Sequence, residues 1–378
     1  MNLFNSKFIL SDKRHGWIDY DRGISIILVT YRHCFEGMEK AGLDLKSHPW
    51  LEYINVFFFG FRMPLFFIAS GMFISQSMKK KGINTYLNNR VQSILYPMLV
   101  WGIIQISLQI LFSSHTNSKG EVGLMSYVYL ITDPRVTGQF WYLNALFFVG
   151  VIYAILKEKL KFNVLHQIIF GVILYAVCAF DNANEINLGF LNDIFKYYLF
   201  FAIGDAVSKL MMDERATKFF TSWKTILPLL VSFITIQYFF TEINMNKDNN
   251  YFVENKMPLF FLLVALVGCG LSIAVSFSLK KSNSLKFLRV VGYNSVHIYC
   301  LQIIIMSVSR QLFIKIGMTN PSLIALLVLS TGILAPIFIY NICLRINLWW
   351  LFTLKKPTEA LNFIQQNKPN TTENIIGS

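Results

Sequence analysis

The ionisable residues that could perform chemistry are gathered in one stretch near the N-terminus, WIDYDRGISIILVTYRHCFE (Trp17–Glu36). The stretch becomes apolar at Gly23, and a charge in the interior of a membrane costs at least ~2.5 kcal/mol, so ionisable groups there are functional candidates. Arg22 and His33 are eleven positions apart, which on a helix is about three turns and roughly 16 Å along the axis. One helix face would therefore carry a permanent cation near one end and an imidazole deep inside.

His33 is the first candidate for catalysis. A lone histidine on an apolar helix is more often a packed, hydrogen-bonded residue than a catalyst. Glu36 lies three positions further on, within side-chain reach, and could orient or charge the ring. A neutral imidazole is the usual general base for a hydroxyl group. The residues alone leave both interpretations of His33 open.

Composition shows what kind of protein must position these groups. Hydrophobic residues make up 54% of the 378 residues and charged residues only 15%, against about 25% charged in soluble domains. The mean hydropathy is +0.48. We therefore predict an all-α, polytopic integral membrane protein whose helices surround a central cavity.

Apolar runs of about 20 residues predict the spanning helices. There are ten such runs, near residues 18–37, 52–77, 92–112, 139–156, 163–180, 190–211, 224–241, 257–279, 288–313 and 322–352. With ten spans, 21 Lys and Arg residues of the connecting segments fall on the side of the two termini and 9 on the other side. Because basic loops stay in the cytoplasm, both termini are predicted to be cytoplasmic. We expect one transmembrane domain over residues 1–356 and a polar, mobile tail over residues 357–378.

Two other classes of site are disfavoured. The net charge of +13 comes from basic residues in short loops between apolar runs, which is typical of membrane topology rather than of nucleic-acid binding. The five cysteines all fall in apolar segments without paired spacing. We therefore expect no nucleic-acid partner, no disulfide framework and no metal.

The spacing Arg22-x10-His33 resembles the signature of the membrane acyltransferase 3 family, and further stretches resemble that family in the same order along the chain. These stretches are MPLFFIASGMF (Met63–Phe73), NNRVQSILYPMLVWG (Asn88–Gly102), FWYLNALFFVG (Phe140–Gly150) and VVGYNSVHIYCLQ (Val290–Gln302). The resemblance extends over all ten predicted spans.

The resemblance implies an activity and a donor. Members of the family move an acyl group, usually acetyl from acetyl-CoA, onto a hydroxyl of a glycan or a lipid-linked glycan. His33 would be the general base on that hydroxyl. Arg22, near the cytoplasmic end, would hold the CoA arm or its phosphates, since a guanidinium donates two parallel hydrogen bonds to phosphate. Arg90 is the second candidate for CoA contact, although an ordinary interfacial arginine is an equal alternative.

The chain departs from the family pattern at two positions. Arg62 and Gln302 stand where relatives commonly have histidine. An arginine facing lipid at mid-span would be costly, so we expect Arg62 in the cavity, either paired with Glu36 or stabilising the developing oxyanion. Gln302 can still form hydrogen bonds.

Five residues are candidates for acceptor binding. Aromatic residues near the end of a span normally form the interfacial belt, and the alternative for Trp141 is stacking on a sugar. Polar residues of later spans could line the cavity, but such residues also bridge packed helices without a catalytic role. The predicted acceptor-binding residues are Trp141, Tyr142, Asn144, Asn294 and Gln302. The roles of Arg32, which points about 100° away from His33 on a helix, and of Asp205, which has no obvious partner, stay open.

We therefore expect a membrane O-acyltransferase of a bacterial inner membrane that transfers acetyl from acetyl-CoA to a surface glycan or its lipid-linked precursor. Its other partners would be membrane lipids, and the sequence leaves the oligomeric state open, a homo-oligomer included. The competing hypothesis is a glycan transporter or flippase in which His33 and Arg62 line a path. A third is a structural subunit in which His33 performs no chemistry. The acceptor sugar, the acyl group and O- versus N-acylation are not fixed by the sequence.

Overall fold

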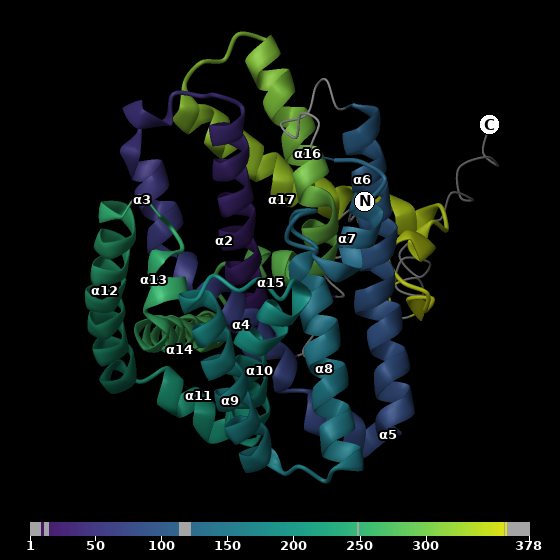
Figure 1. The fold of residues 1–378 in the computed structure, drawn as a ribbon, viewed down its shortest axis with the longest axis vertical. Helices are drawn as coiled ribbons and strands as arrows, with labels where there is room; N and C mark the ends of the chain where they lie inside the picture. The colour runs from purple at the N-terminus through teal and green to yellow at the C-terminus, as the bar shows by residue number, and fades with distance from the viewer. Residues whose placement is uncertain (1–8, 11–14, 113–121, 248, 359, 361–378) are drawn as a thin grey trace, which may run out of the picture.

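The computed structural model describes residues 9–10, 15–112, 122–247, 249–358 and 360. Within these ranges the chain forms helices and no β-strand (Figure 1), which confirms the all-α class. Of the predicted tail, only residues 357, 358 and 360 are described. The rest of the tail, 361–378, lies outside the described residues.

Eight helical stretches of the described chain are long and apolar enough to cross a membrane, which makes the protein a multi-pass membrane protein. They are α3 (Pro49–Phe57) with α4 (Phe59–Gly71), α5 (Ile74–Arg90) with the π-helix η2 (Val91–Leu95) and α6 (Tyr96–Leu111), α8 (Trp141–Lys159), α9 (Val164–Ala183), α12 (Trp223–Asn246), α14 (Pro258–Ser282), α16 (Ser295–Lys315) and α17 (Pro321–Arg345).

Two further helices, α2 (Gly16–Lys40) and α10 (Phe190–Met212), are of similar length, with 25 and 23 residues. They carry too many charged residues to be recognised as membrane-spanning helices from length and composition alone. The count of ten spans therefore stays a prediction. The remaining short elements are η1 (Leu45–Ser47), α7 (Ser126–Thr132), α11 (Glu214–Phe220), α13 (Phe252–Lys256), α15 (Phe287–Tyr293) and η4 (Trp349–Leu351).

Three predicted spans are interrupted. The run 52–77 is broken at Phe58 and again after Gly71, the run 288–313 is broken at Asn294 between α15 and α16, and the run 322–352 is broken after Arg345. At Asn294 the side-chain amide donates to the Val290 carbonyl at 2.8 Å. Asparagine side chains compete in this way with the helical backbone, so a hydropathy pattern alone predicts one helix where there are two.

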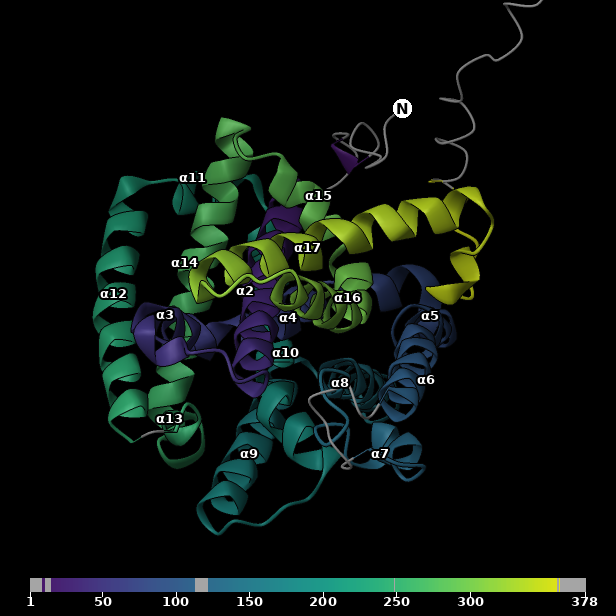
Figure 2. The same cartoon turned by 90° about the horizontal axis from the view of Figure 1, so that it is seen from above.

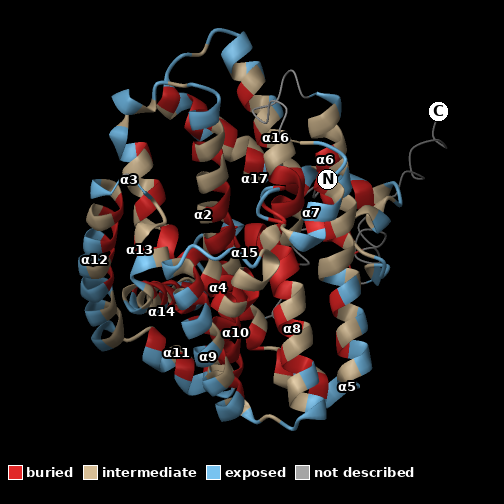
Figure 3. Cartoon of the chain, in the orientation of Figure 1, coloured by how far each residue is buried: buried red, intermediate tan, exposed pale blue. Residues whose placement is uncertain are grey.

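Helix α2 lies in the middle of the bundle and contacts α3, α4, α14, α15, α16 and α17. Figure 2 shows α2, α4 and α10 between α12 on one side and α5 and α6 on the other. Figure 3 shows that α12 exposes most of its surface, whereas α4 and α10 are largely buried. The two long helices that carry several charged residues, α2 and α10, therefore lie inside the bundle with much of their surface buried.

Two close helix crossings hold this centre together, and both use glycine on each helix. At the α2–α15 crossing, a Cβ on Gly292 would lie 1.8 Å from the Asp19 carbonyl oxygen, and one on Gly23 would lie 2.2 Å from that of Leu288. At the α4–α10 crossing, Gly71 and Gly204 face the Phe201 and Ile68 carbonyls in the same way. Small residues let helix backbones approach within a membrane, which increases van der Waals contact.

We predict that Gly292→Ala lowers stability by about 2 kcal/mol or more, because α15 must move away from α2. Gly270→Ala is the matched control, since its Cβ would meet only Leu229 Cδ2 at 3.5 Å. The thermal unfolding midpoint of the detergent-solubilised protein measures both. An equal midpoint for the two variants would contradict the close-packing explanation.

Candidate active site

A cavity of about 1050 Å³ opens beside the Lys40 end of α2. Four predicted site residues line it, namely His33, Glu36, Arg62 and Trp141. Side chains of α4, α6, α8 and α16 complete the wall, together with the segment before α8. The predicted cavity therefore exists. It lies along the second half of α2, from Val29 to Lys40, and does not extend to Arg22.

His33 and Glu36 are adjacent on the α2 surface, as their spacing predicts. The Nδ1 atom of His33 lies 3.4 Å from Glu36 Oε2. Nδ1 is thus the ring nitrogen that faces the carboxylate, and Nε2 is the ring nitrogen that points away from it. The His33 side chain is 15% exposed, so the ring is largely enclosed but borders the cavity.

Arg32 completes this group, which the 100° offset from His33 did not indicate. Its Nε donates to Glu36 Oε1 at 2.6 Å, and its guanidinium lies 5.0 Å from the Phe59 ring centre and 5.1 Å from that of Tyr251. The i,i+4 spacing of Arg32 and Glu36 was the available sequence signal. Glu36 therefore bridges a permanent cation and the imidazole.

Arg62 lines the cavity but does not form an ion pair with Glu36, which corrects one of its two expected roles. Its Nη1 donates to the Leu28 carbonyl and to Asn55 Oδ1, both at 3.3 Å. The side chain is 1% exposed, and its buried Nη2 has no hydrogen-bond partner among the described residues. Glu36 is already paired with Arg32, and Arg62 keeps a free N–H group for another acceptor.

The two predicted CoA-binding arginines lie outside the cavity lining. Arg22 is half-buried on α2, eleven residues before His33 on the same continuous helix. Arg90 is buried, donates to Tyr86 at 2.9 Å and to the Leu146 carbonyl, and packs on Gly150.

Comparison with known proteins gives one match. The family model of the acyltransferase domain, acyltransferase 3, matches residues 15–341. The chain belongs to the acyltransferase 3 family. No curated protein and no solved structure matches it. Membership identifies the protein as a membrane acyltransferase and favours acyl transfer over the transporter and structural-subunit hypotheses.

Tyr142 of this acyltransferase lies beside two aromatic residues of the cavity wall. It is buried and contacts the rings of Tyr299 and Trp141, with centroids 5.3 Å and 6.4 Å away. Both of those rings line the cavity, and the Tyr299 hydroxyl donates to the Gln139 carbonyl. Tyr142 therefore contributes to an aromatic layer behind the cavity rather than to its wall.

The other three predicted acceptor-binding residues also lie outside the lining, contrary to expectation. Gln302 accepts from Thr30 Oγ1 at 2.5 Å, and Asn144 donates to the Ile131 carbonyl at 3.1 Å. The Asn294 amide, besides bonding to Val290, lies 3.2 Å from His297 Nδ1. These contacts join neighbouring helices. Polar residues of a helix bundle often have this structural role instead of a role in binding.

Sequence reasoning missed two arginines of the cavity wall, because both lie outside the family motifs. Arg135 pairs with Asp193, with Nη2 to Oδ1 at 2.6 Å, and its guanidinium lies 4.2 Å from the Trp141 ring centre. Trp141 thus has a cation over one face of its ring, and the stacking of a sugar on Trp141 stays a prediction. Arg310 of α16 is the second. From the sequence it is counted among the basic residues of the outer connecting segments, whereas the structure shows that it is buried.

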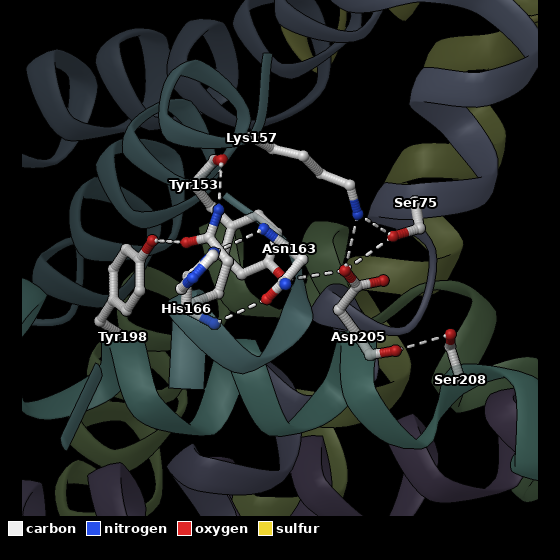
Figure 4. Close-up of polar contacts among 9 residues, drawn as sticks. Ser75, Tyr153, Lys157, Asn163, His166, Tyr198, Asp205 and Ser208 are labelled. Atoms are coloured by element: carbon white, nitrogen blue, oxygen red, sulfur yellow. Dashed lines mark hydrogen bonds and ion pairs between the residues drawn. The ribbon is translucent and has the colours of Figure 1, made fainter. Parts of the chain in front are cut away.

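Asp205 belongs to a separate polar cluster away from the cavity (Figure 4). Its Oδ2 accepts from Ser75 and Tyr153, both at 2.7 Å, and lies 3.0 Å from Lys157 Nζ. The Lys157 ammonium also donates to Ser75. Asp205 therefore joins α5, α8 and α10, and its partner is the lysine that hydropathy placed in a loop.

We predict that Asp205→Ala destabilises the protein by roughly 1–3 kcal/mol, since it leaves Lys157 without its counter-charge; a fully buried pair would lose ~3–5 kcal/mol. We expect the smaller loss because the Lys157 side chain is 25% exposed, so water partly compensates its unpaired charge. Glu158→Ala removes the exposed partner of Lys161 and serves as the control. The double variant Lys157→Met/Asp205→Leu should recover stability. Equal unfolding midpoints for Asp205→Ala and Glu158→Ala would show that the pair is not structural.

Proposed function

We propose that this acyltransferase transfers an acyl group, acetyl in the first instance, from acyl-CoA to a hydroxyl of a surface glycan or lipid-linked glycan, with His33 as general base. Family membership supports acyl transfer. The single observation that carries the residue assignment is that His33 borders the cavity with Nδ1 against Glu36. That cavity has the volume of a site for a sugar-sized ligand.

The chemistry follows from the orientation of the imidazole. With Nδ1–H directed at Glu36, the lone pair on Nε2 accepts the acceptor hydroxyl proton as the oxygen attacks the acyl carbon. Glu36 stabilises the imidazolium that forms, and Arg32 holds the carboxylate in place at 2.6 Å. The C–S bond of the thioester then breaks, and the CoA thiolate that leaves takes the proton from His33. No protein nucleophile is required, because the hydroxyl attacks directly.

Arg62 is suited to the developing negative charge on the acyl oxygen. Its Nη2 is buried without a hydrogen-bond partner in the described part of the chain, and the side chain is held through Nη1 by Leu28 and Asn55. A fixed donor aimed at a developing oxyanion is worth more in a water-poor cavity than in water.

The two arginines predicted to bind acyl-CoA differ in how well they are placed to contact its phosphates. Acyl-CoA supplies an activated thioester and phosphate groups. Arg22 is half-buried near the Gly16 end of α2 and is available to phosphate, whereas both terminal nitrogens of Arg90 already donate to protein groups. Arg22 is therefore the stronger candidate.

The proposed sidedness follows from the Lys and Arg distribution, which places the Gly16 end of α2 in the cytoplasm of a bacterial inner membrane. The donor would then bind from the cytoplasm near Arg22. The acceptor would enter from the opposite side, through the opening beside Lys40.

We predict that His33→Ala lowers acetyl transfer from labelled acetyl-CoA by about 10²-fold or more, because the base is lost. Acetyl-CoA binding should be unchanged, since His33 and Arg22 are about 16 Å apart along α2. The assay uses purified protein with a lipid-linked glycan fraction as acceptor. His166→Gln is the control, an exposed histidine whose capping contact glutamine can replace. Undiminished transfer by His33→Ala would overturn the assignment.

A further inference from the structure

Arg310 is a buried cation of the cavity without a counter-charge among the residues that the structure describes. It lies on α16, is 4% exposed and lines the cavity. Among the described residues, its Nε has no hydrogen-bond partner and no carboxylate forms an ion pair with its guanidinium.

The other arginines of the cavity wall show that this is unusual. Arg32 is paired with Glu36, Arg135 is paired with Asp193, and Arg62 has two oxygen acceptors. Burying an unpaired charge is strongly unfavourable, so buried charges are normally paired. A buried guanidinium that faces a cavity, with no protein partner among the described residues, is therefore complementary to an anionic ligand.

The position of Arg310 relative to His33 is fixed by Gly37. A Cβ on Gly37 would lie 2.2 Å from Arg310 Nη1, so the guanidinium rests directly on the α2 backbone. Gly37 follows His33 by four residues, which places it on the same helix face and about 6 Å further toward Lys40. Arg310 thus lies on the side of His33 opposite to Arg22.

We propose that the acceptor carries an anionic group, a carboxylate or a phosphate, that binds Arg310 while its hydroxyl faces His33. A guanidinium binds either group through two parallel hydrogen bonds. The carboxylate would belong to an acidic sugar, and the phosphate to a lipid carrier or a sugar phosphate. This inference rests on the proposed function for the role of the hydroxyl, but the binding of the anion does not require turnover.

Binding of sugar probes to the purified full-length protein tests this inference without acyl transfer. The probes are methyl glucuronide, glucose 1-phosphate and the neutral methyl glucoside, measured by calorimetric titration. We expect at least one acidic probe to bind at least about tenfold more tightly than the glucoside. Preference for glucuronide indicates an acidic sugar, and preference for glucose 1-phosphate indicates a phosphate-bearing acceptor. Equal affinity for all three probes would overturn the proposal.

Variants of the chain assign the effect to Arg310. Arg310→Gln should reduce the affinity for the acidic probe at least about tenfold, and Arg310→Lys should restore part of it. Gly37→Ala keeps the charge but displaces the guanidinium, and it should weaken binding in the same direction. Lys315→Gln removes an exposed cation from the same helix and should leave affinity unchanged. Retained acidic-probe affinity in Arg310→Gln would overturn the proposal.

The kinetic experiment separates this inference from the proposed function. With acetyl transfer running, Arg310→Gln should raise the KM for an acidic acceptor and leave the KM for acetyl-CoA unchanged. If His33→Ala retains activity while the acidic probes still require Arg310, the base assignment fails and the anion site stands. If His33 is essential but the acceptor KM is insensitive to Arg310, the anion site fails alone.

Discussion

Charge buried inside an apolar bundle is the constraint on which the structure depends. Each buried cation must find an acid, an acceptor oxygen or a ligand, because an uncompensated charge in such surroundings is strongly unfavourable. The Lys157 ammonium is paired with the Asp205 carboxylate at 3.0 Å, and the Lys196 ammonium is paired with the Glu254 carboxylate at 2.9 Å. Because Asp205 and Lys196 lie on α10, this helix must be surrounded by other helices rather than by lipid. The same holds for α2, which carries Glu36. The apolar helix α12 can then face lipid.

Close backbone crossings make this burial achievable. The glycine pairs between α2 and α15 and between α4 and α10 bring helices near enough to exclude lipid from the polar centre. The same device recurs where arginines pack on glycine, as Arg90 does on Gly150 and Arg310 does on Gly37. A guanidinium held against a backbone has a defined position, and that is what a binding or catalytic group needs.

The sequence predicted the helical class, the continuous helix that carries Arg22 and His33, and the contact between His33 and Glu36, because these depend on local periodicity. It did not predict the break at Asn294, where a side chain competes with the backbone. Nor did it predict that Arg310 is buried, because that depends on how α16 lies against Gly37 of α2. Contacts between distant segments decide which polar residues line the cavity and which, such as Gln302, join helices.

The central claim is that α2 presents the donor site and the acceptor site on opposite sides of one membrane. The most direct test is transfer of labelled acetyl by the protein reconstituted in one orientation in sealed vesicles, with acetyl-CoA and acceptor placed on chosen sides. The account predicts labelled product when acetyl-CoA is on the side of the Gly16 end and acceptor is on the side of the Lys40 end. Efficient transfer only when both substrates share one side would contradict it.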